Sequence, residues 1–218
     1  MKVPSNWTFK SSEVASHFDE HVREQLPWYD LATSAVVTIA RHYIHDKARV
    51  YDLGASTGNI GRALADVLRD RDARFTPIEV SREMAKLYEG PGQMINRSII
   101  DVEPEAFDLA VAFLVFMFLP PDQVEPTLRR WTQATKPGGA FIIVERFLPP
   151  GGYLSIVNSR LTLTEKLNAG VDPLEIIEKE LSLAGAQRPL EAYIVEMFGG
   201  VEFFRFGDFA GYIIERER

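Results

Sequence analysis

A glycine-containing stretch in the first quarter of the chain constrains the fold more than any other feature. Arg49 to Leu53 is β-branched and aromatic in character, which predicts a short strand. Residues 59–69 place apolar side chains at i, i+3, i+4, i+7 and i+8, which predicts a helix with a single apolar face. Gly54, Ser56 and Gly58 form the turn between them. In a strand–glycine turn–helix unit the backbone can approach a nucleotide-like ligand closely, because no Cβ stands in the way.

The spacing of the glycines in this turn distinguishes between several known nucleotide-binding motifs. It lacks the Gly-x-Gly-x-x-Gly of dinucleotide sites and the Gly-Lys-Ser/Thr of a P-loop. Asp52 at the strand end, followed by Gly54 and Gly58, instead resembles motif I of class I S-adenosylmethionine-dependent methyltransferases. Any tight strand-to-helix connection also uses glycine, so the rest of the chain has to decide.

The remainder of the chain alternates strand and helix patterns, which predicts an α/β protein with a parallel, doubly wound sheet. Lys136 to Gly139 is a strong turn signal between a helix and a strand. The last two strands flank Gly199 and Gly200, as in the closing hairpin of class I methyltransferases. The resemblance therefore implies a Rossmann-like, seven-stranded, mostly parallel sheet with an antiparallel C-terminal hairpin. We predict strands over 49–53, 74–79, 94–100, 107–115, 140–145, 191–198 and 209–216, and helices over 11–26, 31–44, 59–69, 81–88, 153–168 and 172–185, with one more after Pro120.

The length of 218 residues suits one such domain. We expect residues 1–48 to form N-terminal cap helices of the same domain and residues 49–218 to form the cofactor-binding part. Two interpretations of the N-terminal aromatic residues stay open: a cap over the glycine turn, or simple packing on the sheet edge. These residues are Trp7, Phe9, Phe18, Trp28 and Tyr29.

Composition excludes several activities. The chain has no cysteine, which rules out disulfides, thiolate zinc sites, a cysteine-held iron–sulfur cluster and methylation through a cysteine nucleophile. The net charge of −7 argues against non-specific nucleic-acid binding. His17 and His21 share a helix face, but no third ligand is near, so we predict a surface or lid role and no metal. With neither a transmembrane-length apolar run nor a signal peptide in Met1 to Lys10, we expect a cytoplasmic protein that does not bind membranes.

Glu79 is the most informative residue after the glycine turn. It ends the second predicted strand, where nucleotide-binding α/β folds place a carboxylate that accepts the ribose hydroxyls. It lies 25 residues after Gly54, near the ~20-residue separation of that arrangement. The alternative is a helix-capping or solvated glutamate. Pro77, two residues earlier, is expected at the strand's end because it has no N–H for the ladder.

One branch of the methyltransferase superfamily is especially similar to this chain: the carboxy-S-adenosylmethionine synthase group. The resemblance is carried by residues 18–22, 27–29, 51–56, 118–119, 137–140 and 145–147. It implies that Tyr29 lines the cofactor pocket, that Gly54, Ala55 and Ser56 contact the methionine part, and that Arg160 grips an extra carboxylate. An arginine suits that role because it offers two parallel donors; the alternative is a surface arginine. The implied cofactor-binding set is Tyr29, Asp52, Gly54, Ala55, Ser56, Gly58, Glu79, Val80, Ser98, Ile99, Phe113 and Arg160.

The chain also departs from that branch. Ser98 stands where an acidic residue is expected, and Asp101 replaces it only after a register shift. Phe113 stands where an asparagine is expected, and an insertion before Arg160 is missing. Cofactor binding survives these changes more easily than specialised carboxylate chemistry. We therefore expect S-adenosyl-L-methionine as cofactor and ordinary methyl transfer, with carboxy-S-adenosyl-L-methionine chemistry as the alternative and a non-catalytic binding module as the third.

The acceptor is not specified by the sequence and is either a small molecule or a nucleic acid. No Asn/Asp-Pro-Pro-Tyr/Phe motif is present, so amino-group methylation of adenine or cytosine has no support. Residues 114–117 occupy its place and suggest an apolar pocket wall. Candidate bases are Glu145, His17 and His21, and a homodimer is expected.

Overall fold

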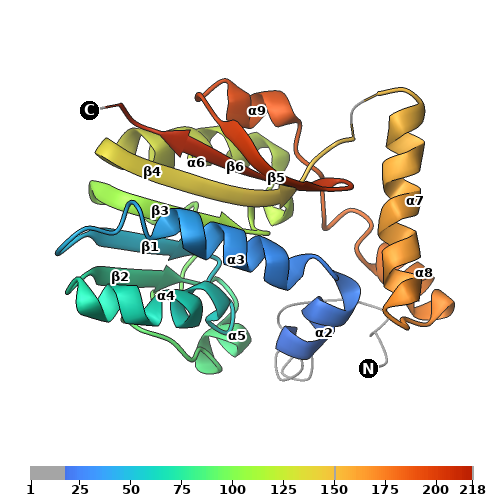
Figure 1. Cartoon of the computed structure of the whole chain (residues 1–218), viewed down its shortest axis with the longest axis horizontal. Helices are drawn as coiled ribbons and strands as arrows, with labels where there is room; N and C mark the ends of the chain where they lie inside the picture. The colour runs from blue at the N-terminus through green and yellow to red at the C-terminus, as the bar shows by residue number, and fades with distance from the viewer. Residues whose placement is uncertain (1–17, 150, 218) are drawn as a thin grey trace.

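Six strands form one mixed sheet in the computed structural model, which describes residues 18–149 and 151–217. The strand order is β2-β1-β3-β4-β6-β5; the first four strands run parallel, and β6 is antiparallel to both β4 and β5 (Figure 1). The predicted Rossmann-like fold with its C-terminal hairpin is confirmed, with six strands in place of seven. The strands are β1 Arg49–Leu53, β2 Arg74–Ile78, β3 Phe107–Phe113, β4 Thr135–Arg146, β5 Val201–Phe206 and β6 Phe209–Glu215.

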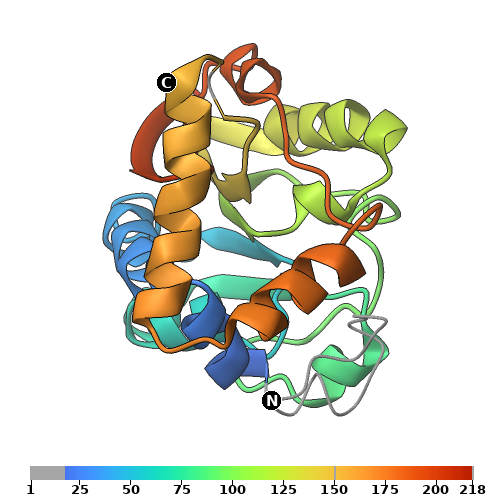
Figure 2. The ribbon, with the colours of Figure 1, turned by 90° about the vertical axis from the view of Figure 1, so that its right-hand side faces the viewer.

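Helices cover both faces of the sheet and its carboxyl edge. Side chains of α3 and α4 join the core on one face, and those of α6 and α9 join the core on the other. Helices α2, α7 and α8 lie beyond the carboxyl ends of the parallel strands (Figures 1 and 2). The helices are α2 Phe18–Gln25, α3 Tyr29–Ala40, α4 Asn59–Asp70, α5 Arg82–Lys86, the 3-10 helix η1 Phe116–Phe118, α6 Pro121–Ala134, α7 Tyr153–Asn168, α8 Pro173–Ser182 and α9 Ala192–Glu196.

Strand β3 shows why the sheet sits at the centre of the molecule. Leu109 and Val111 belong to the core cluster on one face, and Ala110 and Ala112 to the cluster on the other. All seven residues of this strand are buried. A strand covered on both faces needs a continuous apolar run in place of alternation, which explains the predicted strand at 107–115.

The strand predicted over 94–100 is wrong. Only Ile95 pairs with the sheet, in a single bridge to Ile78. Local turns use the following backbone groups, since Arg97 N donates to Ile95 O and Asp101 N to Ser98 O. These turns leave too few free backbone groups for a ladder.

The strand predicted over 191–198 is also wrong, because α9 occupies this segment and β5 follows it. A short apolar run fits a helix or a strand equally well. Gly199, at φ +80°, and Gly200, whose N–H donates to Val195 O, end the helix. They therefore do not make the hairpin turn, which falls at Gly207 and Asp208.

The turn predicted at residues 136–139 is an irregularity inside β4. The strand starts at Thr135, and its register against β3 shifts before Ala140. Gly138 has φ +79°, and a Cβ on Gly139 would lie 2.7 Å from Asp108 O. Glycine thus permits a bulge here in place of a chain reversal.

The described residues include only part of the segment predicted to form the N-terminal cap. The helix predicted over 11–26 is described from Phe18, while Trp7, Phe9 and His17 lie outside the described residues. Trp28 packs against Phe209 with ring centroids 4.6 Å apart, so this aromatic residue packs on the sheet. The division into residues 1–48 and 49–218 stays a prediction. In the part of the chain that the structure describes, every helix is too short or too polar to cross a bilayer.

Candidate functional site

A cavity of about 360 Å³ opens at the carboxyl ends of the parallel strands. Its walls come from the glycine turn after β1, the ends of β2, β3 and β4, and the helices α2, α7 and α8. This is the position at which open α/β sheets bind ligands, outside the strand ends where the strand order reverses. The fold therefore places the predicted turn in the wall of the cavity.

The glycine turn is held by the neighbouring strand. Gly54 N and Ala55 N both donate to Ile78 O, at 2.8 and 2.9 Å. Gly54 and Gly58 have φ of +70° and +104°, and Ser56 has φ +50°. Gly54, Ala55 and Ser56 line the cavity, whereas Gly58 lies in the turn behind it. A Cβ on Gly58 would meet Glu89 O at 2.5 Å, so the glycine is required by protein packing.

Two buried carboxyl groups lie beside this turn. Asp52 is 2% exposed, and its Oδ2 has no hydrogen-bond partner among the described residues. Burial, and then the nearby charge of Glu79, raise the pKa of Asp52 to about 8. Glu79 Oε2 accepts from Ser56 N at 2.9 Å and Oε1 from Ser81 N at 2.7 Å. Burial raises the pKa of Glu79, and these backbone donors oppose the shift. A positively charged group placed here would favour the ionised form of both carboxyl groups.

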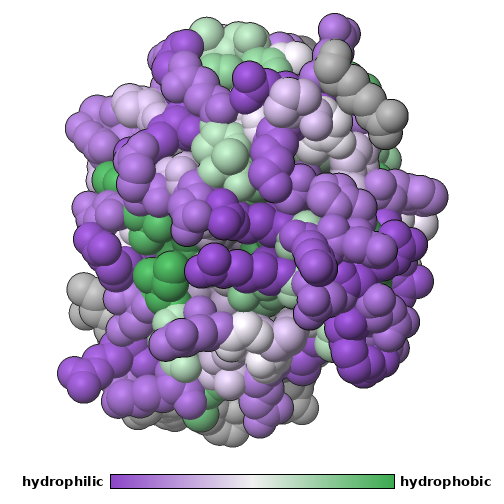
Figure 3. Space-filling view, turned by 90° about the vertical axis from the view of Figure 1, so that its left-hand side faces the viewer, coloured by the Kyte–Doolittle hydropathy of each residue, from purple (hydrophilic) through white to green (hydrophobic). Residues whose placement is uncertain are grey.

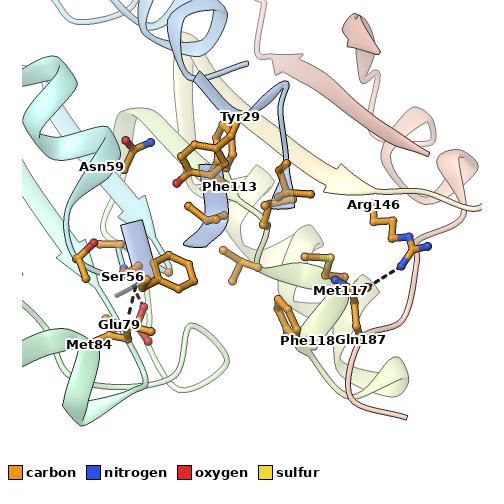
Figure 4. A pocket seen from close by; sticks show the side chains of 18 of the residues that line it. Tyr29, Ser56, Asn59, Glu79, Met84, Phe113, Met117, Phe118, Arg146 and Gln187 are labelled. Atoms are coloured by element: carbon orange, nitrogen blue, oxygen red, sulfur yellow. Dashed lines mark hydrogen bonds between the residues drawn. The ribbon is translucent and has the colours of Figure 1, made fainter. Parts of the chain in front are cut away.

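Apolar side chains flank the two carboxyl groups. Tyr29 contacts Phe113 edge-on, with ring centroids 5.1 Å apart. Figure 4 shows these two rings facing the space above Ser56 and Glu79. Burial raises the pKa of Tyr29, so its hydroxyl stays neutral. The remaining predicted residues on this wall are Val80, Ser98 and Ile99.

The far end of the cavity, under α7 and α8, carries cations. Arg146 Nη1 donates to Gln187 Oε1 at 2.8 Å, and both lie across the cavity from Ser56 and Glu79 (Figure 4). Lys166 is 5% exposed and lies 3.2 Å from Glu180 Oε1. Lys179 Nζ lies 2.8 Å from His21 Nε2. We call Arg146, Lys166 and Lys179 the cationic end.

Some predicted residues lie elsewhere. Arg160 is exposed on α7 and is not among the residues that line the cavity. Glu145 is fully buried and accepts from Val115 N and Phe116 N, both at 2.6 Å, so it supports the wall from behind. His21 lines the cavity and is buried, so of the predicted surface or lid role the surface alternative is wrong. Burial, followed by the charge of Lys179, lowers the pKa of His21 to about 3 and makes it a poor base.

Sequence reasoning missed the cationic end. Arg146 lies within residues 145–147, which carry the family resemblance, but that resemblance implies no role for it. Lys166 and Lys179 lie on separate helices and meet only through the tertiary fold. Their position on the polar sides of α7 and α8 gave no signal, because a solvated face has the same pattern.

Comparisons with known proteins agree with this geometry. Residues 51–141 match a family model described as a methyltransferase domain. The carboxy-S-adenosyl-L-methionine synthase of Staphylococcus epidermidis is 29% identical over 192 residues, covering 86% of this chain and 84% of that protein. Human N-acetylserotonin methyltransferase, solved in complex with SAM, superposes with a TM-score of 0.60 at 13% identity, covering 96% of this chain and 58% of the other. The DhpI–SAH complex gives a TM-score of 0.59 at 15% identity and 96% coverage of both chains.

The motif, the sheet order and the family match all lead to the same assignment. The chain has the fold of S-adenosylmethionine-dependent methyltransferases, its residues 51–141 match a methyltransferase domain, and over most of its length it is similar to carboxy-S-adenosyl-L-methionine synthases.

Proposed function

We propose that the cavity binds S-adenosylmethionine at its acidic end and that the enzyme transfers the methyl group to an acceptor at the cationic end. The observation that carries this proposal is the buried Asp52 Oδ2, which has no partner among the described residues and lies beside the glycine turn. A buried carboxylate oxygen without a donor costs free energy. An ammonium group supplies the missing donor.

The residues at this end fit the cofactor. S-adenosylmethionine carries a sulfonium and an ammonium group, and the wall around the turn offers Asp52, Glu79 and Asp19 with no lysine or arginine among its described lining residues. We assign Gly54, Ala55 and Ser56 to the methionine part and Glu79 to the ribose hydroxyls. Tyr29, Val80, Ser98, Ile99 and Phe113 would enclose the rest of the cofactor.

Catalysis here depends on position more than on acid–base chemistry. When bound, the cofactor supplies an electrophilic methyl group for an in-line displacement. The apolar wall of Phe113, Val115 and Met117 excludes water and fixes the approach of the acceptor. A base is optional, and His21 is unsuited to that role. The acceptor is a small molecule or a nucleic-acid group that reaches this cavity.

We further propose a cytoplasmic homodimer that buries the outer face of α7. Most of the large side chains on this face are apolar and exposed, and Arg160 lies among them, four residues after Ile156 and three before Leu163. By contrast, the opposite end of the molecule is mainly hydrophilic (Figure 3). In a dimer, Arg160 would reach toward the partner rather than its own cavity. The exposed apolar residues of α7 are Tyr153, Leu154, Ile156, Val157, Leu161, Leu163 and Leu167.

The second candidate function is synthesis or use of a carboxylated cofactor. It is favoured by the curated relatives, which carry the name carboxy-S-adenosyl-L-methionine synthase, and by the cationic end, which offers partners for a carboxylate. Mass spectrometry of ligand carried through purification separates the two functions. S-adenosylmethionine or its demethylated product supports methyl transfer, and a species heavier by one carboxylate supports the second candidate.

Glu79→Ala tests the cofactor site directly. We expect the dissociation constant for S-adenosylhomocysteine to rise by about 10- to 150-fold, equivalent to ~1.5–3 kcal/mol for a charge-assisted hydrogen bond. Glu83→Ala is the matched control, because Glu83 belongs to α5 and pairs with Lys86. Calorimetric titration of both variants gives the answer. Equal affinity in Glu79→Ala and wild type would leave Glu79 as a purely structural residue.

A further inference from the structure

The two ends of the cavity carry opposite charge. Around the glycine turn, the lining acids are Asp19, Asp52 and Glu79. Under α7 and α8, the described lining residues include three cations and only one acid, Glu180. A cationic cofactor explains the first end and leaves the second unexplained. This asymmetry indicates that a second ligand of opposite charge binds across from the cofactor.

Arg146 has donor capacity left for such a ligand. Gln187 takes one N–H at 2.8 Å, while Glu180 and Asp208 lie farther away, at 3.7 and 3.8 Å. Arg146 Nε is buried and has no hydrogen-bond partner among the described residues. A guanidinium group presents its donors in a planar fork that matches a carboxylate or a phosphate. Its position at the end of β4 fixes this fork at the cavity wall.

Lys166 comes to the same end from a different element. It projects from α7, where the outward face is apolar, and it is 5% exposed. Glu180 accepts one hydrogen bond from its ammonium group, which has three N–H donors. Lysine is rarely buried without a reason, because burial of its charge is costly. Glu180 already pairs with this charge, and a ligand anion would accept from the N–H donors that Glu180 leaves.

Lys179 reports on the local electrostatics. Burial, and then the positive charge of Lys166, lower the pKa of Lys179 to about 7, although Glu175 and Glu180 oppose the shift. Burial is the first of these causes, so the positive charge of Lys179 costs free energy where the side chain lies. An anion bound here would raise the pKa of Lys179, so binding near pH 7.5 would take up protons.

We infer that the acceptor carries an anionic group, a carboxylate or a phosphate, which Arg146 and Lys166 hold at the cationic end while the cofactor occupies the acidic end. This inference rests on the proposed function, because it takes the second ligand to be the acceptor. The apolar residues Met117, Leu183 and Phe209 also line the cavity, so the acceptor has an apolar part as well as its anionic group.

Three small probes test the inference: benzoate, phenyl phosphate and the neutral isostere benzamide. Each is titrated calorimetrically into the 218-residue chain, with and without saturating S-adenosylhomocysteine. We expect one of the anions to bind at least about tenfold more tightly than benzamide, as charge-assisted hydrogen bonds require. The preferred anion identifies the carboxylate or the phosphate. Titration at pH 7.5 in buffers of different ionisation enthalpy should show net proton uptake for that anion only.

Arg146→Gln and Lys166→Met locate the site. Each should weaken binding of the preferred anion at least about fivefold, with benzamide and S-adenosylhomocysteine changed by less than about twofold. Arg129→Gln is the matched control, because Arg129 is exposed on α6 and pairs with Glu125. Equal binding of the anions and benzamide, or full anion preference in both variants, would overturn the inference. If the wild type does not bind S-adenosylhomocysteine, the proposed function is contradicted instead. The titrations of the three probes in the absence of S-adenosylhomocysteine would still test the cationic end. Two variants guard against a folding defect in one of them.

Discussion

Asp52 holds a carboxyl group where its charge is disfavoured. The pKa of this group has its ordinary value, near 3.8, in the unfolded chain, and burial raises it to about 8 in the folded protein. Between pH 3.8 and pH 8, Asp52 therefore keeps its proton in the folded state and has lost it in the unfolded state. Stability linked to this group is present below the unfolded pKa and is lost as the pH rises toward 8. Local sequence could place Asp52 at the strand end but could not reveal its burial.

Asp52→Asn should therefore change the pH dependence of stability. We expect the ligand-free wild type to lose unfolding free energy from pH 5 to pH 8, with Asp52 contributing up to about 1.4 kcal/mol per pH unit. The variant should show a shallower loss, because its side chain does not ionise. Urea unfolding at four pH values measures both slopes. Parallel curves for the two proteins would contradict the raised pKa.

Gly54 is constrained by the protein itself, in addition to its proposed role at the cofactor. A Cβ at this position would lie 2.5 Å from Val115 Cγ2, and its φ of +70° disfavours other residues. Gly54→Ala should destabilise the fold by about 1–2 kcal/mol from backbone strain alone, with the contact adding to it. Adding Val115→Ala removes the contact and should recover part of the loss. Thermal unfolding of the single and double variants checks this, and no recovery would mean that strain alone sets the cost.

At the scale of elements, the connection from β3 to η1 depends on a residue of another strand. Leu114 has φ +60°, an unfavourable value for leucine, and its N–H donates to Val144 O. Glu145 on β4 then accepts from the amides of Val115, Phe116 and Met117. One buried carboxylate thus positions a stretch of the cavity wall. Burial raises the pKa of Glu145 to about 8, and these amides oppose the shift.

Glu145→Ala should loosen this connection. Buried amides would be left without an acceptor, at about 1–3 kcal/mol each, so we expect a loss of several kcal/mol of stability. S-adenosylhomocysteine should bind more weakly in the same variant, because Val115 and Met117 line the cavity. Glu125→Ala on α6 is an exposed control. Urea unfolding and calorimetric binding of S-adenosylhomocysteine, measured on both variants, test this expectation. Wild-type stability and affinity in Glu145→Ala would contradict the supporting role of Glu145.

Elements were predictable from sequence where local patterns decide them. The strand–turn–helix unit at residues 49–70 follows from glycine geometry and from the apolar face of one helix. The strand at 94–100 failed because backbone turns compete with pairing there, and the strand at 191–198 failed because a short apolar run has no decisive period. The cationic end could not be predicted for a different reason. Its residues come from β4, α7 and α8, which are separate elements of the chain and meet only in the folded protein.

At the scale of the whole molecule, helix α7 has its polar and apolar sides reversed relative to an ordinary surface helix. Thr162 and Lys166 face the cavity, whereas apolar residues face outward. Large exposed apolar patches on soluble proteins usually mark an interaction surface. The proposed dimer gives this face a partner and keeps the cavity of each subunit polar on that side.

Val157→Glu should break that dimer. Burying a charge in an apolar interface costs several kcal/mol, and Arg160 is a single cation on the same, mainly apolar face. We expect wild type to elute as a dimer and the variant as a monomer in size-exclusion chromatography with light scattering. Val201→Glu provides the control, because Val201 is also an exposed valine, at 64% against 39% for Val157, but lies on β5. A monomeric wild type would contradict the dimer, and so would a variant that remains dimeric.

Pro77 has a consequence for behaviour in solution. It sits one residue before the end of β2, at the edge of the sheet, where the expected third strand does not form. Ile95 N donates to Pro77 O, so the backbone of this residue faces outward. A proline there offers no N–H to an incoming strand, and Gly92 packs closely against Phe75 O on the same edge. The protein thereby avoids an open template for edge-to-edge aggregation, which a missing strand would otherwise create.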